Sequence, residues 1–467
     1  MVRRRDGQGL LGEVVLFGVL GTPETLLDPA LRRVDALLGD EVLIDTVWTV
    51  LRQRRPQSAR RGRPGTPAEV VLRLLVLKHL KGWSYAELEW EVRGSVAYRH
   101  FCRLGGGTVP DAKTLVRLGQ LLDAGALQDV LARVVAVARE RRVTRGRRLR
   151  IDTTVVEAAI RHPTDSGLCA DVVRVVSRTL RRLGQVGIAF PTRVRDVRRS
   201  VRRRVYEIGQ AMRRRGEAAT AALQRPYRGL LRVTGRLVRQ ATATAAAAPA
   251  QLATLPAVQQ RAATRALAVL ATILPRAAQV LAQTRARIVR GETTSAGKLV
   301  SLFEPTAQIL RRGKPHRPTE FGRLVEVHET EGGIVTAVGV VEGKADAPLL
   351  VPAVAQHGGR FGRAPCLVAT DRAFYSTDGE RRVRELGGHH AVIPKPGFRS
   401  RERIGYEQRR WFRRGRAWRA GGEARIARLK HCFGLARARY RGDPGMARPI
   451  YWAAIANNLL AIATRAA

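Results

Sequence analysis

Acidic residues are scarce in this 467-residue chain relative to basic ones. There are 39 Asp and Glu against 84 Lys and Arg, a formal net charge of +45. A field of that sign and size favours a polyanionic partner. Lysine is scarce as well, because only eight of the basic residues are Lys and 76 are Arg, the residue that contacts phosphate bidentately. A GC-rich genome would favour Arg over Lys, but it would not explain why acids fail to balance the charge.

Cysteine is limited to four scattered residues without a CxxC pair: Cys102, Cys169, Cys366 and Cys432. Their spacing argues against a zinc site and a disulfide framework, and it favours a reducing cytoplasm as the location. No period of 20–50 residues recurs, which excludes a repeat protein.

Neither apolar end of the chain is typical of a membrane or export segment. The N-terminal apolar run contains Asp6 and Glu13 and lacks a clear cleavage site, which argues against a signal peptide. The C-terminal segment 449–467 is apolar but short for a bilayer, and Asn457 and Asn458 lie at its centre. We therefore expect a packed core helix there, and no membrane partner.

The first 140 residues have the periodicity of helices. Residues 24–53 precede a basic, Pro- and Gly-containing linker at 53–65 of the kind that can lie along DNA. Thr66 as N-cap, with Glu69 completing a capping box, predicts a helix that ends at Gly82.

A second capping box, Ser84 with Glu87, predicts the next helix, and a third helix is expected over 98–104. Two helices joined by a tight turn and followed by a third indicate a helix-turn-helix unit. Short helical hairpins are common and most bind no DNA, but the flanking Arg runs favour DNA binding. Helices are also expected after the cap Asp111 and over 124–141.

Residues 165–290 have an almost uninterrupted helical pattern, rich in Arg and Ala, with Asp165 or Ser166 as the expected first cap. The segment VRDVRRSVRRR contains six Arg in eleven residues. The structural alternative is a helical bundle whose charges face water. Solvated faces usually mix both signs, so we favour a helical insertion that holds the DNA backbone.

From residue 299 the period changes to that of strands. KLVSLFEP at 298–305 and the segment 323–343 predict strands, the latter a β-hairpin turning at residues 331–333. A helix over 348–356 and strands over 366–370 and 389–395 follow. Four aromatic residues are interleaved with nine Arg in the arm 398–419, a pattern typical of surfaces that clamp backbone and stack bases: Tyr406, Trp411, Phe412 and Trp418.

Three carboxylates stand where a metal site needs them. Asp152 lies in a β-branched segment, RRLRIDTTVVEAAI, that predicts a strand. Asp371 ends the apolar run CLVAT, and Glu423 lies on a predicted helix. Because Gly421 and Gly422 are weak helix formers, we expect this helix to begin close to Glu423. Convergent carboxylates are the ligands of a two-metal site that cleaves phosphodiesters.

Arg419 and Lys430 are expected on the same helix face as Glu423, four residues before it and seven after it. The structural alternative is a simple salt bridge between Arg419 and Glu423. Competing third acids are Glu380, Glu402 and Glu407, none of which has both the Arg and the Lys at matching helical offsets.

Several motifs together resemble the DDE transposases of bacterial insertion sequences, in particular the ISNCY-type group. They are IDTTVVEAAIRHPTDSGL, SLFEPTAQILRRGKPHRPTEFG, ATDRAFYS and WRAGGEARIARLK with its trailing FGLARARYRGDPGM, and the helical N-terminal segment GRPGTPAEVVLRLLVLKHLKGWSYAELEWEV resembles their end-binding domain. The family's signature of Tyr, Arg, Glu and Lys matches at Arg419, Glu423 and Lys430 but has Arg416 in place of Tyr.

The resemblance implies an α/β fold with an RNase H-like catalytic core of mixed sheet and flanking helices. The domains expected are an N-terminal helical DNA-binding domain at 1–140, core segments at 141–164 and 299–467, and an all-helical insertion at 165–298. Asp152, Asp371 and Glu423 would be the catalytic acids and the ligands of two Mg²⁺ or Mn²⁺ ions. We expect these residues to contact DNA: Arg372, Arg410, Trp411, Arg413, Arg414, Arg419 and Lys430.

The resemblance also implies DNA cleavage and strand transfer at terminal inverted repeats, with target DNA as the second partner. It implies a homodimer in the DNA complex and a nucleoid-associated location in the bacterial cytoplasm. Glu157, Asp165 and Glu304 belong to the matching motifs too, and we expect them to be supporting groups. Two alternatives remain: a non-catalytic DNA-binding derivative, and an RNase H-like nuclease without strand transfer.

Overall fold

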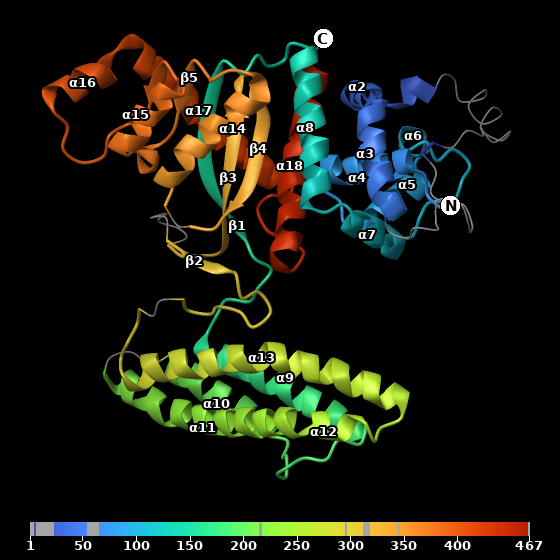
Figure 1. Cartoon of the computed structure of the whole chain (residues 1–467), viewed down its shortest axis with the longest axis vertical. Helices are drawn as coiled ribbons and strands as arrows, with labels where there is room; N and C mark the ends of the chain where they lie inside the picture. Colours follow the sequence, from blue (N-terminus) through green and yellow to red (C-terminus); the bar gives the residue numbers. More distant parts are fainter. Residues whose placement is uncertain are drawn as a thin grey trace. The chain divides into compact units, whose positions relative to one another are not determined.

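The chain divides into two compact units in the computed structural model, which describes residues 4–5, 23–53, 65–213, 217–294, 297–311, 318–343 and 345–465. Unit 1 comprises Met1–Ala159 and Gly322–Ala467, and unit 2 is Ile160–Phe321 (Figure 1). Most of the N-terminal apolar run and of the predicted linker lies outside the described residues.

The N-terminal part of unit 1 is entirely helical. After the short η1 (Pro23–Leu26), its helices are α2 (Pro29–Leu37), α3 (Glu41–Gln53), α4 (Ala68–Lys81), α5 (Tyr85–Gly94), α6 (Val96–Phe101), α7 (Ala112–Leu121) and α8 (Ala124–Glu140). Helix α4 is the central one, because its residues from Ala68 to Lys78 are buried and it packs against α3, α5 and α7. A helix buried on all sides explains why this segment is apolar all round.

Most of the predicted helix ends in this region are confirmed. Ser84 and Glu87 form the capping box of α5, with distances of 3.2 Å and 2.6 Å, and Gly82 ends α4 with φ of 71°. The prediction for Thr66 was wrong: Pro67 is the N-cap of α4 and no side chain caps that helix. Glu69 instead bonds to the buried Arg73 at 2.9 Å, since a buried guanidinium needs a carboxylate partner.

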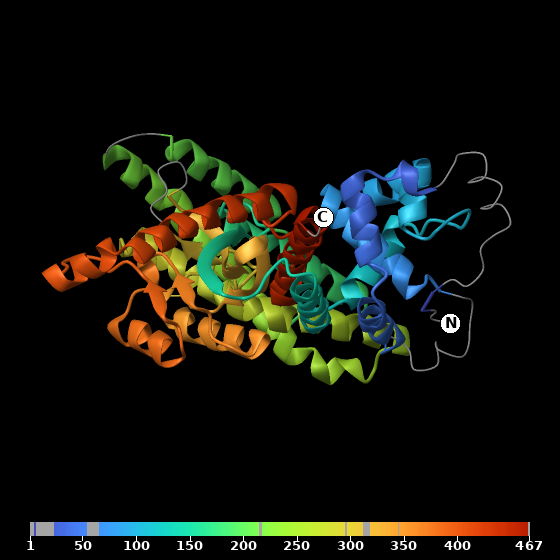
Figure 2. The same cartoon turned by 90° about the horizontal axis from the view of Figure 1, so that it is seen from above.

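The chain also forms a curled mixed sheet whose strands, apart from β2, lie mainly in unit 1, and β1 is drawn as a broad teal arc (Figure 2). Its strands run in the order β2-β3-β1-β5-β6, with β4 paired to β3. Strand β1 is antiparallel to β3 and parallel to β5. The bounds are β1 (Arg148–Glu157), β2 (Gln308–Leu310), β3 (Glu320–Thr330), β4 (Ile334–Val341), β5 (Leu367–Ala369) and β6 (His390–Val392).

The hairpin predicted around residues 331–333 is confirmed, because η3 (Glu331–Gly333) joins β3 to β4. The two glycines of this turn have φ of 81° and 73°, values that favour glycine. The strand predicted at 298–305 is wrong, since the described residues there are irregular and β2 follows instead.

Helices cover both faces of the sheet. On one face, Leu149 and Ile151 of β1 pack with the buried Leu350 and Val354 of α14 (Leu350–Phe361), and α15 (Thr377–Glu385) packs beside it. On the other face, α16 (Arg401–Gln408) leads into α17 (Arg410–Cys432), which packs on β5 and β6. Strand alternation therefore directs Arg150 and Asp152 toward α17.

Helix α17 does not begin near Glu423, contrary to the prediction from Gly421 and Gly422. The helix runs through both glycines, which bring it close to β1: a Cβ on Gly421 would lie 3.0 Å from Arg150 Nη1, and one on Gly422 would lie 3.8 Å from Asp152 Oδ2. Gly421 therefore makes a close contact with β1, and neither glycine marks a helix end.

The C-terminal α18 (Gly442–Arg465) is a core helix, as predicted. It packs against α2, α4, α8 and β4, and Asn457 and Asn458 are fully buried. Both amides are satisfied: Asn458 bonds to the backbone N–H and C=O of Val335, at 2.8 Å and 2.7 Å, and Asn457 donates to Gly333 O. This pairing ties the helix to the hairpin.

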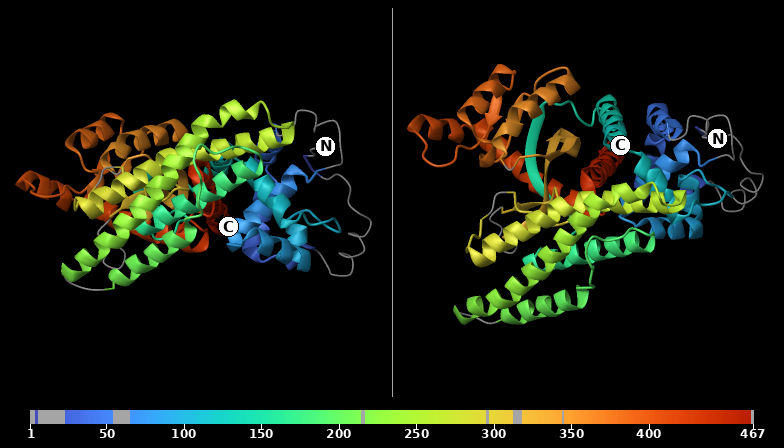
Figure 3. Two further views of the ribbon diagram at one scale, coloured as in Figure 1. Left: turned by 90° about the horizontal axis from the view of Figure 1, so that it is seen from below. Right: turned by 60° about the horizontal axis from the view of Figure 1, so that its bottom comes forward.

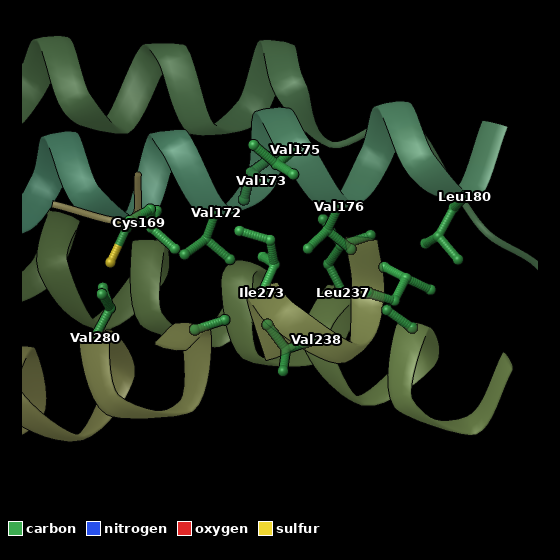
Figure 4. Packing of buried hydrophobic residues seen from close by; sticks show 14 of the residues in the cluster. Cys169, Val172, Val173, Val175, Val176, Leu180, Leu237, Val238, Ile273 and Val280 are labelled. Carbon is green, nitrogen blue, oxygen red and sulfur yellow. The ribbon is translucent and has the colours of Figure 1, made fainter. Parts of the chain in front are cut away.

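Unit 2 is a bundle of helices that lie alongside one another, as the helical pattern predicted (Figure 3). They are α9 (Asp165–Gln185), α10 (Arg198–Ala211), α11 (Glu217–Ala247), α12 (Pro249–Leu252) and α13 (Ala257–Val289). Val172 and Val176 of α9 meet Leu237 of α11 and Ile273 of α13 in a core of its own (Figure 4). Among the described helices, α13 alone is long and apolar enough to cross a membrane by length and composition.

Thr164, not Asp165 or Ser166, caps α9 through a bond from Gly167 N of 3.1 Å. Asp165 is buried instead, and its carboxylate pairs with Arg287 at 2.7 Å and with Lys298 at 3.8 Å. A buried acid needs such partners, so this one is committed to the packing of unit 2.

Candidate active site

Strand register places Asp152 and Asp371 next to each other. In the parallel pair of β1 and β5, Arg150 lies opposite Ala369. Two residues further along each strand direction come Asp152, still within β1, and Asp371, just past the end of β5. The carboxyl end of adjacent parallel strands is where a sheet offers side chains to a ligand.

Arg419 of α17 joins all three predicted acids. Its Nη2 lies 3.3 Å from Asp152 Oδ2 and 3.9 Å from Asp371 Oδ2, and its Nη1 lies 3.3 Å from Glu423 Oε1. Residues from one central strand, one strand end and one helix therefore converge on a single guanidinium, and the simple Arg419–Glu423 salt bridge is only part of the arrangement.

The site has a buried floor and an open edge. The side chains of Asp152 and Asp371 are 15% and 26% exposed, whereas that of Glu423 is 74% exposed. Each aspartate also uses its Oδ1 locally: Asp152 accepts from Thr153 N at 2.8 Å, and Asp371 caps η5 (Arg372–Phe374) by accepting from Ala373 N at 2.9 Å. These bonds leave the Oδ2 atoms directed at Arg419.

A network behind the acids holds the strand and the helix together. Glu329 of β3, whose side chain is 3% exposed, forms salt bridges with Arg150 at 2.6 Å and with Arg425 of α17 at 3.1 Å. Arg150 also donates to Trp418 O at 2.6 Å and lies over the ring of that residue. Sequence reasoning missed this network, although the period-two spacing of Arg150 and Asp152 already placed both on one strand face.

The donor set suits a hard divalent cation, because carboxylate oxygens are the ligands that Mg²⁺ and Mn²⁺ take. Within the described ranges, no three His, Cys, Asp or Glu side chains are grouped closely enough to hold a metal ion. The three acids here surround the Arg419 cation instead, so the same oxygens already stabilise positive charge.

The competing third acids lie elsewhere in unit 1. Glu380 and Glu407 are buried and share Arg403 of α16, with distances of 2.7 Å and 2.9 Å. Burial opposes the charge on Arg403, but the hydrogen bond to Glu407 and the charge of Glu380 outweigh it and raise the pKa of Arg403. Glu402 is exposed on α16.

The predicted DNA-contacting arginines Arg372, Arg410, Arg413 and Arg414 are exposed, and Lys430 is half-buried.

The aromatic rings of the arm pack on the protein. Trp411 stacks on His390 with centroids 4.5 Å apart, Phe412 is fully buried, and Tyr406 and Trp418 join the same cluster on β5 and β6. The expectation that Phe412 stacks on bases is therefore wrong, because apolar burial on the sheet claims the ring. A contact of Trp411 with DNA remains a prediction.

Comparison with known families finds one match. Residues 25–121 match a family described as Transposase domain (DUF772). The match supports a transposase. It spans the helical region from η1 to α7, outside the carboxylate site. No curated protein and no solved structure matches the chain.

Within the region matched by the transposase family, α5 stands where a helix-turn-helix would place its second helix. It carries Glu87, Glu89 and Glu91 against a single Arg93. A helix of that charge repels phosphate, so the surface of α5 is a poor one for backbone contact. Basic residues lie instead near the end of α6, at Arg99 and Arg103.

Proposed function

We propose that this chain is the transposase of an insertion sequence, and that Asp152, Asp371 and Glu423 carry its DNA cleavage and strand transfer. The observation that carries the proposal is the convergence of these three acids on Arg419. The transposase-domain match at 25–121 supports the same function independently, because it lies in a different part of the chain.

The fold supports an RNase H-like core for this enzyme. A mixed sheet with helices on both faces carries one acid on a central strand, one at the end of the neighbouring strand and one on a helix. Unit 2 lies in the chain between β1 and β3, which are adjacent antiparallel partners. We therefore propose that unit 2 is a helical domain inserted into this core, between the part of the catalytic domain that contains β1 and the part that begins with β3.

Asp152, Asp371 and Glu423 would hold two Mg²⁺ or Mn²⁺ ions. When bound, such ions supply an activated water and neutralise charge on the scissile phosphate. The chain itself supplies positioning: Glu329 holds Arg150 and Arg425. The exposed Arg372 beside Asp371 and the half-buried Lys430 would bind flanking phosphates.

The proposed partners are the terminal inverted repeats and the target DNA, with a homodimer in the DNA complex. The net charge of +45 supports a polyanionic partner. Helices of the 25–121 region would bind the repeats, and the arginines of α17 would hold the backbone. The location proposed is the bacterial cytoplasm, at the nucleoid.

A second candidate is a non-catalytic DNA-binding derivative. It is favoured by one observation: the guanidinium of Arg419 lies against all three carboxylates, so the acids have a cationic partner within the protein. An RNase H-like nuclease without strand transfer differs from a transposase only in its products.

The deciding experiment is cleavage of a labelled duplex that carries the element's terminal repeat, in Mg²⁺ or Mn²⁺. We expect the wild type to nick at the repeat boundary and to join the free 3′ end to target DNA. Asp152→Asn, Asp371→Asn and Glu423→Gln should each abolish nicking and leave binding of the repeat largely intact. Glu402→Gln, which changes an exposed acid on α16, is the matched control and should cleave normally.

Each other outcome has a definite meaning. Binding without a nick in every protein would reject catalysis in favour of the DNA-binding derivative. A nick without a joined product would reject strand transfer and leave a nuclease. Loss of folding in all three acid variants would make the acids structural.

A further inference from the structure

A hollow of about 1010 Å³ lies between α10 and α11 of unit 2. Both helices belong to the same bundle and pack directly against each other. Five arginines and one acid, Glu207, line the groove; the arginines are Arg203, Arg204, Arg225, Arg228 and Arg232. Glu207 pairs with Arg203 at 3.4 Å, which leaves a strong excess of positive charge in the groove.

The positive charge continues along α11 as a ridge. Arg225, Arg228, Arg232, Arg236 and Arg239 follow one another at intervals of three or four residues and are all exposed. Such spacing places them on one helix face over about 21 Å. The opposite face carries the apolar core residues Leu230, Leu237 and Val238. The ridge is therefore not a by-product of core packing.

A row of like charges costs stability in an isolated helix, because arginines four residues apart repel each other by a few tenths of a kcal/mol. After Glu217 at its first residue, α11 has no acid to offset that repulsion. A face maintained only for solubility usually mixes both signs. This one is suited to a partner with closely and regularly spaced negative charges.

The floor of the groove is shaped around an arginine. A Cβ on Gly229 would lie 2.7 Å from Arg204 Nε, so the absence of a side chain there makes room for the guanidinium group. Arg204 also donates to Ser200 O at 3.0 Å and to Ser200 Oγ, which hold it in place. Tyr206 stands on the wall, 66% exposed, and offers an aromatic face of the kind on which sugars and bases stack.

We propose that the α10–α11 groove and its arginine ridge form a DNA-binding surface, separate from the carboxylate site, that holds the phosphate backbone without regard to sequence. The ridge spaces its charges by about 4.5–6 Å along a line, and a nucleic-acid strand presents its phosphates in a comparable row. The choice of DNA as the polyanion rests on the proposed function. The binding itself requires no cleavage.

The test is the salt dependence of binding to a random-sequence duplex in EDTA, with full-length protein. Each phosphate contact contributes about 0.9 to the slope of log K against log salt. We expect the triple variant Arg225→Gln, Arg228→Gln, Arg232→Gln to lose about 2–3 from that slope. The matched control replaces three exposed arginines of α13, Arg261, Arg265 and Arg285, by Gln and has the same net charge. It should keep the wild-type slope.

Gly229→Leu provides a test without any change of charge. The added side chain would displace Arg204 and occupy the groove, so we expect at least about tenfold weaker DNA binding with an unchanged helical circular dichroism spectrum. Equal slopes for the groove variant and its control, or wild-type affinity in folded Gly229→Leu, would overturn the proposal.

Three further results distinguish this inference from the proposed function and from a membrane contact. Cleavage by the wild type together with an unaltered slope in the groove variant would reject the groove and keep the transposase. If the salt slope falls in the groove variant but no protein cleaves DNA, the groove would stand as a DNA-binding surface and catalysis would be rejected. If the groove arginines were needed for binding to phosphatidylserine vesicles but not to DNA, the surface would be a membrane contact and the proposal would fail.

Discussion

Arg419 holds the three acids in their present positions. Asp152 and Asp371 are mostly buried and direct one oxygen each at its Nη2. Two carboxylates so placed repel each other unless a cation lies between them. Arg419 provides that cation in the absence of metal, so a divalent ion bound by the same oxygens would have to compete with it.

Replacing Arg419 by Met should therefore have opposite effects on stability and on metal binding. We expect the free energy of unfolding in EDTA to fall by about 1–2 kcal/mol, because the substitution removes a cation from beside two partly buried carboxylates that repel each other. Addition of Mn²⁺ should then raise the melting temperature more in this variant than in the wild type, since the competing guanidinium is gone.

Thermal melting with and without Mn²⁺ measures both effects. Arg416→Met is the matched control, because Arg416 is exposed one turn earlier on α17, and it should change neither. A smaller Mn²⁺ response in Arg419→Met than in the wild type would show that Arg419 supports metal binding instead of competing with it.

At the scale of elements, the distance between α17 and the sheet depends on glycine. A Cβ on Gly415 would lie 2.5 Å from Val392 Cγ2 of β6, closer than side chains tolerate. The close approach brings Arg419, one turn further along α17, to the strand ends. Helix propensity alone would favour alanine at this position, so packing decides against the local preference.

Gly415→Ala should consequently destabilise unit 1 although alanine is the better helix former. We expect a loss of about 1–2 kcal/mol, as for overpacked cores, measured by urea unfolding. The control is Gly405→Ala in α16, where a Cβ meets nothing within 4 Å, and it should gain up to about 1 kcal/mol.

The double variant Gly415→Ala with Val392→Ala tests the cause. The added Cβ of Gly415→Ala would clash with the side chain of Val392. The free-energy losses of the two single variants should therefore be clearly less than additive in the double variant. Strict additivity would mean that the destabilisation by Gly415→Ala arises somewhere other than at β6.

At the scale of the whole molecule, the end of β1 lies beside the start of β3, although the whole of unit 2 and the short strand β2 come between them in the sequence. Glu157 at the end of β1 is paired with Gly322 of β3, and a Cβ on Gly322 would lie only 2.0 Å from Val156 O. Glu157 and Gly322 are as close as the two ends of a hairpin turn, so a short turn could join them. Unit 2 has a hydrophobic core of its own.

Replacement of residues 158–321 by Asn-Gly removes unit 2 together with the end strand β2 and the first two residues of β3, and it should leave a folded unit 1. This dipeptide favours the two-residue turn that joins antiparallel strands, and Glu157 and Gly322 would flank it as they pair now. We expect a cooperative thermal transition and retained near-ultraviolet circular dichroism, with a smaller salt slope for DNA binding than the full chain. An aggregated or non-cooperative product would show that unit 1 depends on unit 2 to fold.

Local signals were predictable from the sequence. The capping box of Ser84 and Glu87, the end of α4 at Gly82 and the turn at 331–333 were all recognised and are confirmed. The strand that carries Asp152 was recognised as well. Each depends on residues within a few positions of one another, and backbone geometry is decided there.

Contacts between distant residues could not be predicted in the same way. Helix α17 runs through Gly421 and Gly422, which lie against Arg150 and Asp152 from another part of the chain. Glu69 accepts a hydrogen bond from Arg73 instead of joining a capping box, because the buried guanidinium needs an acidic partner. Residue type and periodicity were enough to select the acids and the helices. Only folding decided that Arg419 would lie among the three acids, because that position depends on strand register and glycine-mediated helix packing together.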